Sequence, residues 1–157
     1  MTRDGLLAIN TPKGWVQQSQ GPGLAFFVPA GVEPGDPEVW IYISSNPVGP
    51  AEDPKDLEAF IQADIAGFKE HFKHGQVRAE EAQDLPIAKQ KAPMYSFQSG
   101  ESDNAFEQVV YLDDGQRVLI LTLSAKSSRA LEGAQQVFRE FAQSYGGSIQ
   151  MDSPKQE

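Results

Sequence analysis

The sequence FEQVVYLDDGQRVLILTLSA at residues 106–125 decides which fold this chain can adopt. It predicts two strands, Phe106–Leu112 and Val118–Ala125, joined by a turn at Asp113–Gln116. Asp-Gly between two β-rich runs is typical of a hairpin, because both residues tolerate the positive φ that a tight turn requires. The sequence therefore predicts a β-hairpin at the centre of the domain.

Apolar residues occur on both faces of this hairpin. In its second strand, Leu119, Leu121 and Leu123 share one face, and Val118 and Ile120 share the other. The first strand shows the same two-sided pattern, with Val109 and Tyr111 opposite Phe106, Val110 and Leu112. Because strand side chains alternate between faces, apolar residues on both faces require a cover on both. A hairpin is not stable alone, so we expect further strands and a layer on each side.

The remaining strands are expected on either side of the hairpin in the sequence. Glu38–Ser44 is the clearest, because Trp40 and Tyr42 alternate with aliphatic residues and both of its faces are apolar. Pro93 suggests that the strand Ala92–Phe97 lies at a sheet edge or begins there. Three short apolar strands are predicted at Leu6–Ile9, Trp15–Val16 and Leu24–Val28. The polar segment Gln76–Asp84 is expected to be an edge strand or a loop.

Two amphipathic helices are predicted. Asp53 is the expected N-cap of the first, with Pro54 at its first helical position, and Gly75 is its expected end. Ser127 or Ser128 is the expected cap of the second. Both helices carry an apolar stripe at three- and four-residue spacing, formed by Leu57, Phe60, Ile61, Ile65, Phe68 and Phe72 in one and by Leu131, Ala134, Phe138, Phe141, Ala142 and Tyr145 in the other. The pattern indicates an α+β fold, an α-β-α sandwich whose largely antiparallel sheet of six or seven strands has helices on both faces.

Length and charge limit the domain count and the partners. Residues 1–150 are expected to form one domain and residues 151–157 a disordered tail. The chain has 22 acidic and 13 basic residues, a net charge of −9, which argues against nucleic acid and anionic membranes as partners. It has no cysteine, which excludes disulfides and thiolate chemistry. No run of residues is long and apolar enough to span a bilayer.

Candidate catalytic groups are few. His71 and His74 lie three residues apart beside Glu70, in the expected last turn of the first helix. A metal site there would need a further ligand from elsewhere, whereas two solvated residues at a helix end need none. The chain lacks a Gly-x-Ser-x-Gly motif, and Gly-Pro-Gly at residues 21–23 lacks the Lys-Ser/Thr ending of a phosphate loop. We therefore expect no catalytic, cofactor-binding or metal-binding residues, with an enzyme near His71 and His74 as an alternative.

The aromatic residues Trp15, Trp40 and Tyr42 are the candidate partner-binding residues. Exposed aromatic side chains offer a large contact area to a ligand, although such residues also dominate the buried core of most domains. An exposed apolar patch around these three would indicate a docking surface.

The order of elements and three short motifs resemble the PsbP-like family. The motifs are TPKGW at residues 11–15, GLAFFVPAG at residues 23–31 and VWIYIS at residues 39–44, followed by a Phe-rich helix, a hairpin and a closing amphipathic helix. The family includes the extrinsic photosystem II subunit, the Ran-binding Mog proteins and small bacterial exported or lipid-anchored proteins. The resemblance implies an α-β-α sandwich and a non-catalytic role in binding or assembly.

These observations favour a non-catalytic accessory or binding domain of an exported or lipid-anchored bacterial protein, with an unidentified protein as its partner. We expect a location outside the cytoplasm, reached after removal of a leader, with the cytoplasm as the alternative. A cytoplasmic adaptor or chaperone for a secreted partner is the second functional hypothesis. The sequence specifies neither the partner nor the oligomeric state.

Overall fold

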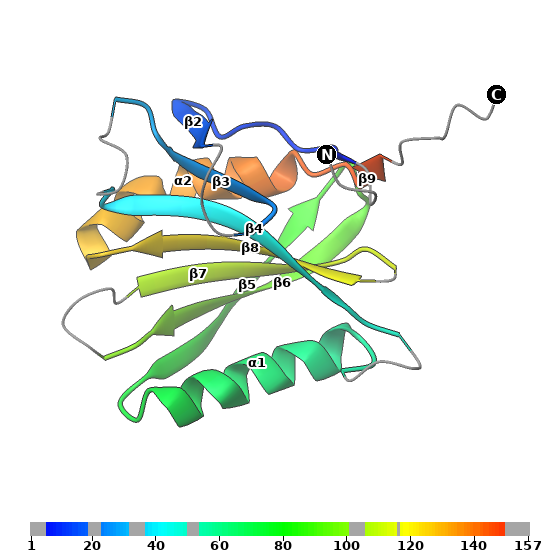
Figure 1. Cartoon of the computed structure of the whole chain (residues 1–157), viewed down its shortest axis with the longest axis vertical. Coiled ribbons are helices and arrows are strands. Elements are labelled where there is room, and N and C mark those ends of the chain that lie inside the picture. Colours follow the sequence, from blue (N-terminus) through cyan, green and yellow to red (C-terminus); the bar gives the residue numbers. More distant parts are fainter. Residues whose placement is uncertain are drawn as a thin grey trace.

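The computed structural model describes residues 6–18, 23–31, 37–49, 54–100, 106–115 and 117–149. The expected tail at residues 151–157 and the expected N-cap Asp53 lie outside these ranges. The elements follow along the chain in the order drawn in Figure 1: β1 (Leu6–Leu7), β2 (Trp15–Gln18), β3 (Ala25–Pro29), β4 (Val39–Pro47), α1 (Leu57–His71), β5 (Gln76–Leu85), β6 (Gln90–Gln98), β7 (Phe106–Asp113), β8 (Arg117–Ala125), α2 (Ser128–Gln143) and β9 (Ser148–Ile149).

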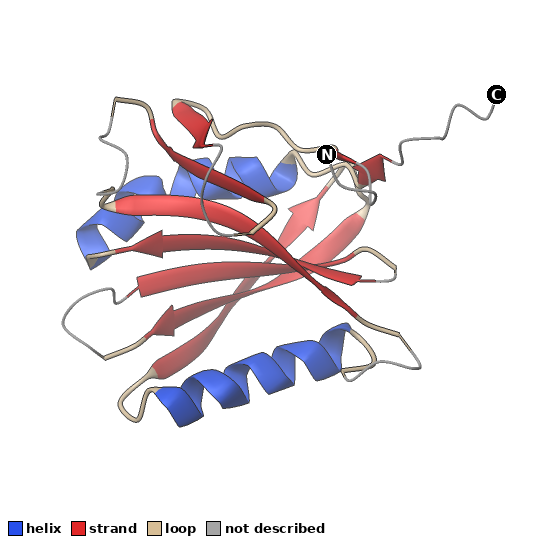
Figure 2. Ribbon diagram, viewed as in Figure 1, coloured by secondary structure: helices blue, strands red, loops and turns tan. Residues whose placement is uncertain are grey.

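Seven strands form one antiparallel sheet in the order β2-β3-β4-β8-β7-β6-β5. After β4 the chain passes through α1 to the far edge of the sheet, and β5 to β8 then return strand by strand until β8 pairs with β4. Strands β1 and β9 form a separate two-stranded sheet. Figure 2 shows the strands as one twisted red layer, with α1 and α2 in blue at well-separated places. The predicted α+β class and largely antiparallel sheet are confirmed.

The predicted central hairpin is formed by β7 and β8. Leu112 pairs with Leu119 and Tyr111 with Ile120, so the two apolar faces continue across both strands. Gly115 has a φ of 83°, a value that favours glycine, and its N–H donates to Asp113 Oδ1 at 2.9 Å. The Asp-Gly turn thus sets the register that the sequence pattern requires.

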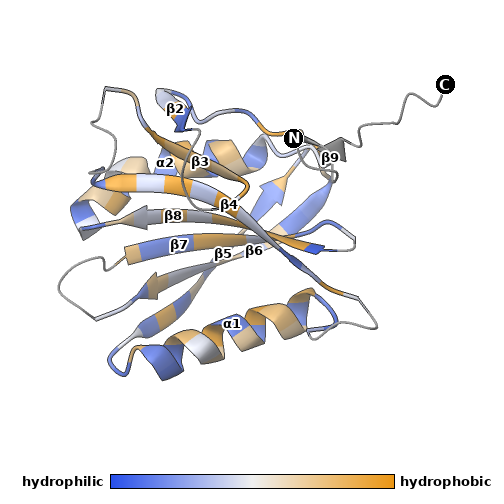
Figure 3. Ribbon diagram, in the orientation of Figure 1, coloured by the Kyte–Doolittle hydropathy of each residue, from blue (hydrophilic) through white to orange (hydrophobic). Residues whose placement is uncertain are grey.

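Helices cover both faces of the sheet. Under α2, the strand side chains of Ile41, Leu121 and Leu123 are 0% exposed, as is Phe138 of the helix itself. On the opposite face, Ile61 of α1 belongs to a second apolar cluster with strand residues that include Val109, Tyr111 and Val118. Figure 3 shows much of β3 and β4 in hydrophobic orange and the edge strand β5 largely in hydrophilic blue. The expected sandwich is therefore confirmed, with its most completely buried layer between the sheet and α2.

The beginning and the end of α1 differ from the sequence-based expectation. The helix begins at Leu57, and its N-cap is Asp56, whose Oδ1 accepts a hydrogen bond from the Ala59 N–H at 2.8 Å. Pro54 therefore lies before the helix, so the predicted start was wrong. The helix ends at His71 with Phe72 as its C-cap, before Gly75. For α2, the N-cap is Ser127, one of the two predicted residues.

Replacing Asp56 with alanine should lower the free energy of unfolding by about 1 kcal/mol, because the Ala59 N–H loses its acceptor. Urea denaturation followed by circular dichroism measures this change. The control is Asp53→Ala at the position that the sequence favoured, for which we expect no comparable loss. A larger loss for Asp53→Ala than for Asp56→Ala would contradict the assignment of the cap.

Strand β6 is an internal strand, so of the two positions expected for Pro93 the sheet edge was wrong. The strand begins at Gln90, and its pairing with β7 begins at Met94, directly after Pro93. β6 pairs with β5 on one side and with β7 on the other. Pro93 is tolerated because the β5–β6 register shifts there: Glu80 pairs with Met94, but Gln83 pairs with Ala92. This β-bulge gives β5 one extra residue opposite Pro93, where the missing N–H interrupts no regular ladder. The edge strand on this side is β5, which contains the polar segment Gln76–Asp84.

Candidate functional site

The face of the sheet that carries α1 is less completely buried than the face under α2. Helix α1 packs over β5 and β7, and its Phe68 ring lies 5.0 Å from the Phe97 ring of β6. Farther across the same face, Phe26, Trp40 and Tyr42 are half-buried, and Val16 is 42% exposed. The β2–β3–β4 part of this face therefore presents aromatic side chains to solvent.

The structure brings Trp40 and Tyr42 together and places Trp15 elsewhere. Trp40 pairs with Ser124 and Tyr42 with Thr122, so both aromatic residues lie on the face that carries α1. Trp15 lies on the opposite face and packs against the core cluster under α2. Of the three predicted partner-binding residues, only two can therefore contribute to one surface.

Glu107 of β7 is the acidic group closest in the sheet to these aromatic residues. It pairs across the strands with Ser124, whose hydroxyl donates to Glu107 Oε2 at a long 3.5 Å. Burial raises the pKa of the Glu107 carboxyl, and the charge of Asp64 raises it further, against the opposing effect of the Ser124 hydrogen bond. Among the described residues, no Lys, Arg or His forms an ion pair with Glu107. A half-buried carboxylate without a cation is costly, which is typical of binding sites.

Helix α1 supplies a second carboxylate to this surface. The Tyr111 hydroxyl donates to Asp64 Oδ2 at 2.5 Å, and burial together with Asp64 raises the pKa of Tyr111. Burial and the charge of Glu107 likewise raise the pKa of the Tyr42 hydroxyl. We call Trp40, Tyr42, Asp64 and Glu107 the acidic aromatic face; Tyr111, which is 0% exposed, lies beneath it. Two carboxylates beside aromatic rings are suited to a cationic group, because both interact favourably with positive charge.

Replacing Glu107 with glutamine should stabilise the protein at neutral pH. The folded-state pKa of Glu107 lies above its unfolded value, which means that ionised Glu107 is less favourable in the folded protein than in the unfolded one. Ionisation of this carboxyl therefore lowers the free energy of unfolding. The penalty is absent below about pH 4, where the group is protonated in both states, and it grows as the pH rises toward the folded pKa. Thermal unfolding at several pH values should show that Glu107→Gln raises the unfolding temperature increasingly as the pH rises above about 4.

The matched control is Glu80→Gln, for which the opposite sign is expected. A hydrogen bond from Ser96 and the neighbouring Arg78 lower the pKa of Glu80, whose Oε2 lies 2.6 Å from Ser96 Oγ. Ionised Glu80 therefore contributes stability above its unfolded pKa, and this contribution is lost as the pH falls through the folded pKa. Destabilisation by Glu107→Gln at neutral pH would contradict the proposed environment of that residue.

The histidines do not form a converging site in the described part of the chain. His71 is the last residue of α1, and His74 lies in the turn beyond it, so the expectation that both occupy the last helical turn was wrong. Both are exposed, and the His71 ring contacts the Phe72 ring edge-on at 4.5 Å. No group of three or more His, Asp or Glu side chains among the described residues could hold a metal ion.

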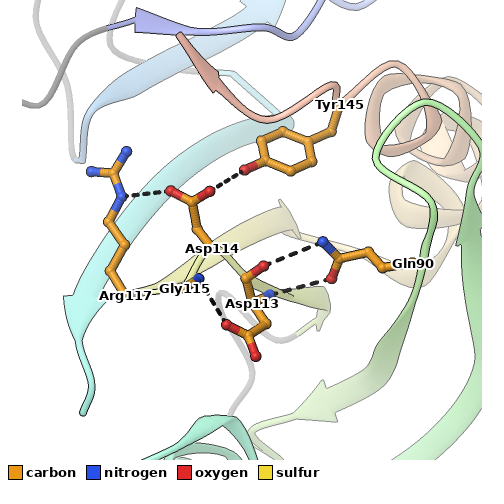
Figure 4. Close-up of polar contacts among 6 residues, drawn as sticks. All are labelled: Gln90, Asp113, Asp114, Gly115, Arg117 and Tyr145. Atoms are coloured by element: carbon orange, nitrogen blue, oxygen red, sulfur yellow. Dashed lines mark hydrogen bonds and ion pairs between the residues drawn. The ribbon is translucent and has the colours of Figure 1, made fainter. Parts of the chain in front are cut away.

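A second polar cluster surrounds the β7–β8 turn and serves the fold. Asp114 pairs with Arg117 at 3.1 Å and accepts a hydrogen bond from the Tyr145 hydroxyl at 3.1 Å (Figure 4). The Gln90 side chain bonds both the N–H and the carbonyl of Asp113, at 3.4 and 3.2 Å. These contacts fasten the turn to β6 and to the segment after α2, and they explain the adjacent aspartates without a catalytic role.

The comparisons with known proteins agree with this architecture. No family model matches the sequence, and no curated protein matches it significantly. The solution structure of cyanobacterial PsbP (CyanoP) from Synechocystis sp. PCC 6803 is similar to the structure of this chain, with a TM-score of 0.57 over 92% of this chain and 88% of that chain. The chain has a PsbP-like fold. With 13% sequence identity the likeness to CyanoP shows the fold alone, and it confirms the predicted structural resemblance. No helix in the described ranges is long and apolar enough to cross a membrane.

Proposed function

We propose that this chain is a non-catalytic binding domain that docks a basic segment of a protein partner on the acidic aromatic face. The observation that carries the proposal is Glu107, a half-buried carboxylate in the same strand-to-strand row as Trp40, with no ion pair to a described cation. Its charge also acts on the Tyr42 hydroxyl, whose pKa it raises. A lysine or arginine of the partner would supply the missing charge, and its aliphatic stem would pack on the aromatic rings.

The charge of the whole chain supports a basic partner. A net charge of −9 attracts positively charged segments over a distance and repels acidic ones. The PsbP-like fold, shared with a cyanobacterial protein, supports an accessory domain of an exported or lipid-anchored bacterial protein. Binding by surface recognition requires no catalytic group.

A cytoplasmic adaptor for a secreted protein is the second candidate, and the exposed Val16 favours it. Val16 is 42% exposed and pairs with Val28 on the face that carries Trp40. An adaptor that holds an unfolded segment would use this apolar extension and would select aliphatic rather than basic sequences.

Selection from a random peptide display library distinguishes the two candidates. A docking site for basic segments should enrich peptides that contain Lys or Arg next to an apolar residue, and their binding should weaken at high salt. Enrichment of uncharged aliphatic peptides would favour the adaptor. Enrichment of acidic peptides, or of none, would contradict the proposal. Tyr42→Ala should reduce recovery of the selected peptides.

A further inference from the structure

Two clefts lie between α2 and the strands β5, β6 and β7, and Gln108 lines both of them. The larger has a volume of about 660 Å³ and the smaller about 360 Å³. Gln108 of β7 pairs with Ser96 of β6, and both side chains point to the side of the sheet that α2 covers. The smaller cleft contains no residue of the acidic aromatic face, whereas the larger cleft shares Glu107 with it.

Gln108 contains an unpaired polar atom. The residue is 4% exposed, and its Oε1 is buried without a hydrogen-bond partner among the described residues. Such atoms are rare in folded proteins, because a buried acceptor that loses its water without gaining a donor is unfavourable. Because Gln108 lines both clefts, a rotation of its side chain would present this acceptor to an O–H or N–H donor of a ligand bound there.

The lining of the larger cleft indicates the chemistry of this ligand. Its largest class of side chains is neutral and can both donate and accept hydrogen bonds. These are the side chains of Gln76, Gln98, Gln108, Gln135, Ser96 and Ser128. The formal charges of the lining, on Lys69, Arg78, Glu107 and Glu132, sum to zero, although Arg78 forms its ion pair with Glu80 and no described cation pairs with Glu107. The lining as a whole therefore carries no net charge that would favour an ionic ligand. The half-buried Phe106 supplies an aromatic surface in the same cleft.

We propose that the larger cleft binds a small uncharged polyhydroxyl molecule, of the size of a monosaccharide or disaccharide, with one hydroxyl donating to Gln108 Oε1. Sugar hydroxyls donate and accept like the amides and serines that line the cleft, and the C–H face of a sugar ring packs on an aromatic side chain. The volume falls within the range of about 300–1,000 Å³ that is usual for small-molecule sites.

Saturation-transfer NMR with the full chain tests this proposal. The probes are glucose, galactose, mannose, N-acetylglucosamine, sucrose, trehalose and maltose at millimolar concentration. We expect transfer to at least one of them and an affinity at least tenfold lower in Gln108→Leu. That variant should unfold at the same or a higher temperature than the wild type, because it removes the unpaired acceptor.

The matched control is Gln136→Leu, on an exposed position of α2 outside the cleft, which should bind like the wild type. If Gln108→Leu does not fold, Gln135→Ala on the helix side of the cleft replaces it, with the same expected loss. Absence of transfer to every sugar, or unchanged binding by the cleft variant, would overturn the proposal. So would binding of the tripeptide Gly-Ser-Gly in place of the sugars. Tyr42 does not line the cleft, so the effect of Tyr42→Ala on peptide recovery tests the acidic aromatic face separately from each of these outcomes.

Discussion

Phe138→Ala is expected to lower the free energy of unfolding by about 3–5 kcal/mol, because it removes a large buried ring and leaves a cavity. Phe138 is 0% exposed, and its ring stacks on that of Phe141 at a centroid distance of 6.5 Å. The Phe141 ring in turn contacts Phe27 of β3 at 5.3 Å. The change therefore acts on the contact between α2 and the sheet, and urea denaturation followed by circular dichroism measures it.

The control for Phe138→Ala is Gln136→Ala on the exposed side of the same helix, where we expect a change within about 0.5 kcal/mol. The comparison separates the loss of packing from any effect on helix propensity, since both positions receive alanine. A loss below about 1 kcal/mol for Phe138→Ala, far under the usual range for buried rings, would show that α2 does not cover the sheet as described.

Trp40→Ala should weaken the binding of a selected basic peptide at least tenfold, a loss of about 1.4 kcal/mol or more. Tryptophan is enriched among the residues that dominate interface energies, and Trp40 lies in the same strand-to-strand row as Ser124 and Glu107. Isothermal titration calorimetry on folded protein measures the change. The affinities of the wild type and the variant should both fall at high salt, where the carboxylates contribute less.

Trp15→Ala is the matched control for Trp40→Ala. Both tryptophans are half-buried strand residues, but they lie on opposite faces of the sheet. We expect Trp15→Ala to reduce stability and to leave the peptide affinity within a factor of two. An equal loss of affinity for both variants would mean that the effect comes from general destabilisation rather than from the acidic aromatic face.

The architecture could be predicted because the alternation of apolar residues in the central hairpin indicates on which face of the sheet each side chain lies. Leu119 and Val118 are both 0% exposed although they face opposite sides, which is what a two-sided apolar pattern requires. The start of α1 and the position of Pro93 in the sheet were harder to predict. Asp53 and Asp56 are equally suitable caps in the sequence, and Pro93 depends on a bulge in the neighbouring strand that no local pattern reveals.

The candidate site could be predicted only in part. The alternation in β4 correctly puts Trp40 and Tyr42 on one face, but the pairing of β2 with β3 was needed to place Trp15 on the other. Glu107 carried a signal that the sequence analysis missed, because it is an acidic residue on an otherwise apolar strand face with Val109 and Tyr111. The role of Asp64 depends on a hydrogen bond between α1 and β7, residues far apart in the sequence.

The central claim is that a basic partner occupies the face formed by Trp40, Tyr42 and Glu107. The chain contains two tryptophans, so its proton–nitrogen NMR spectrum has two indole signals, which Trp15→Phe assigns. During titration with a selected basic peptide, the Trp40 signal should shift progressively and the Trp15 signal should stay in place. A shift confined to Trp15, or no shift of Trp40 at saturation, would contradict the account.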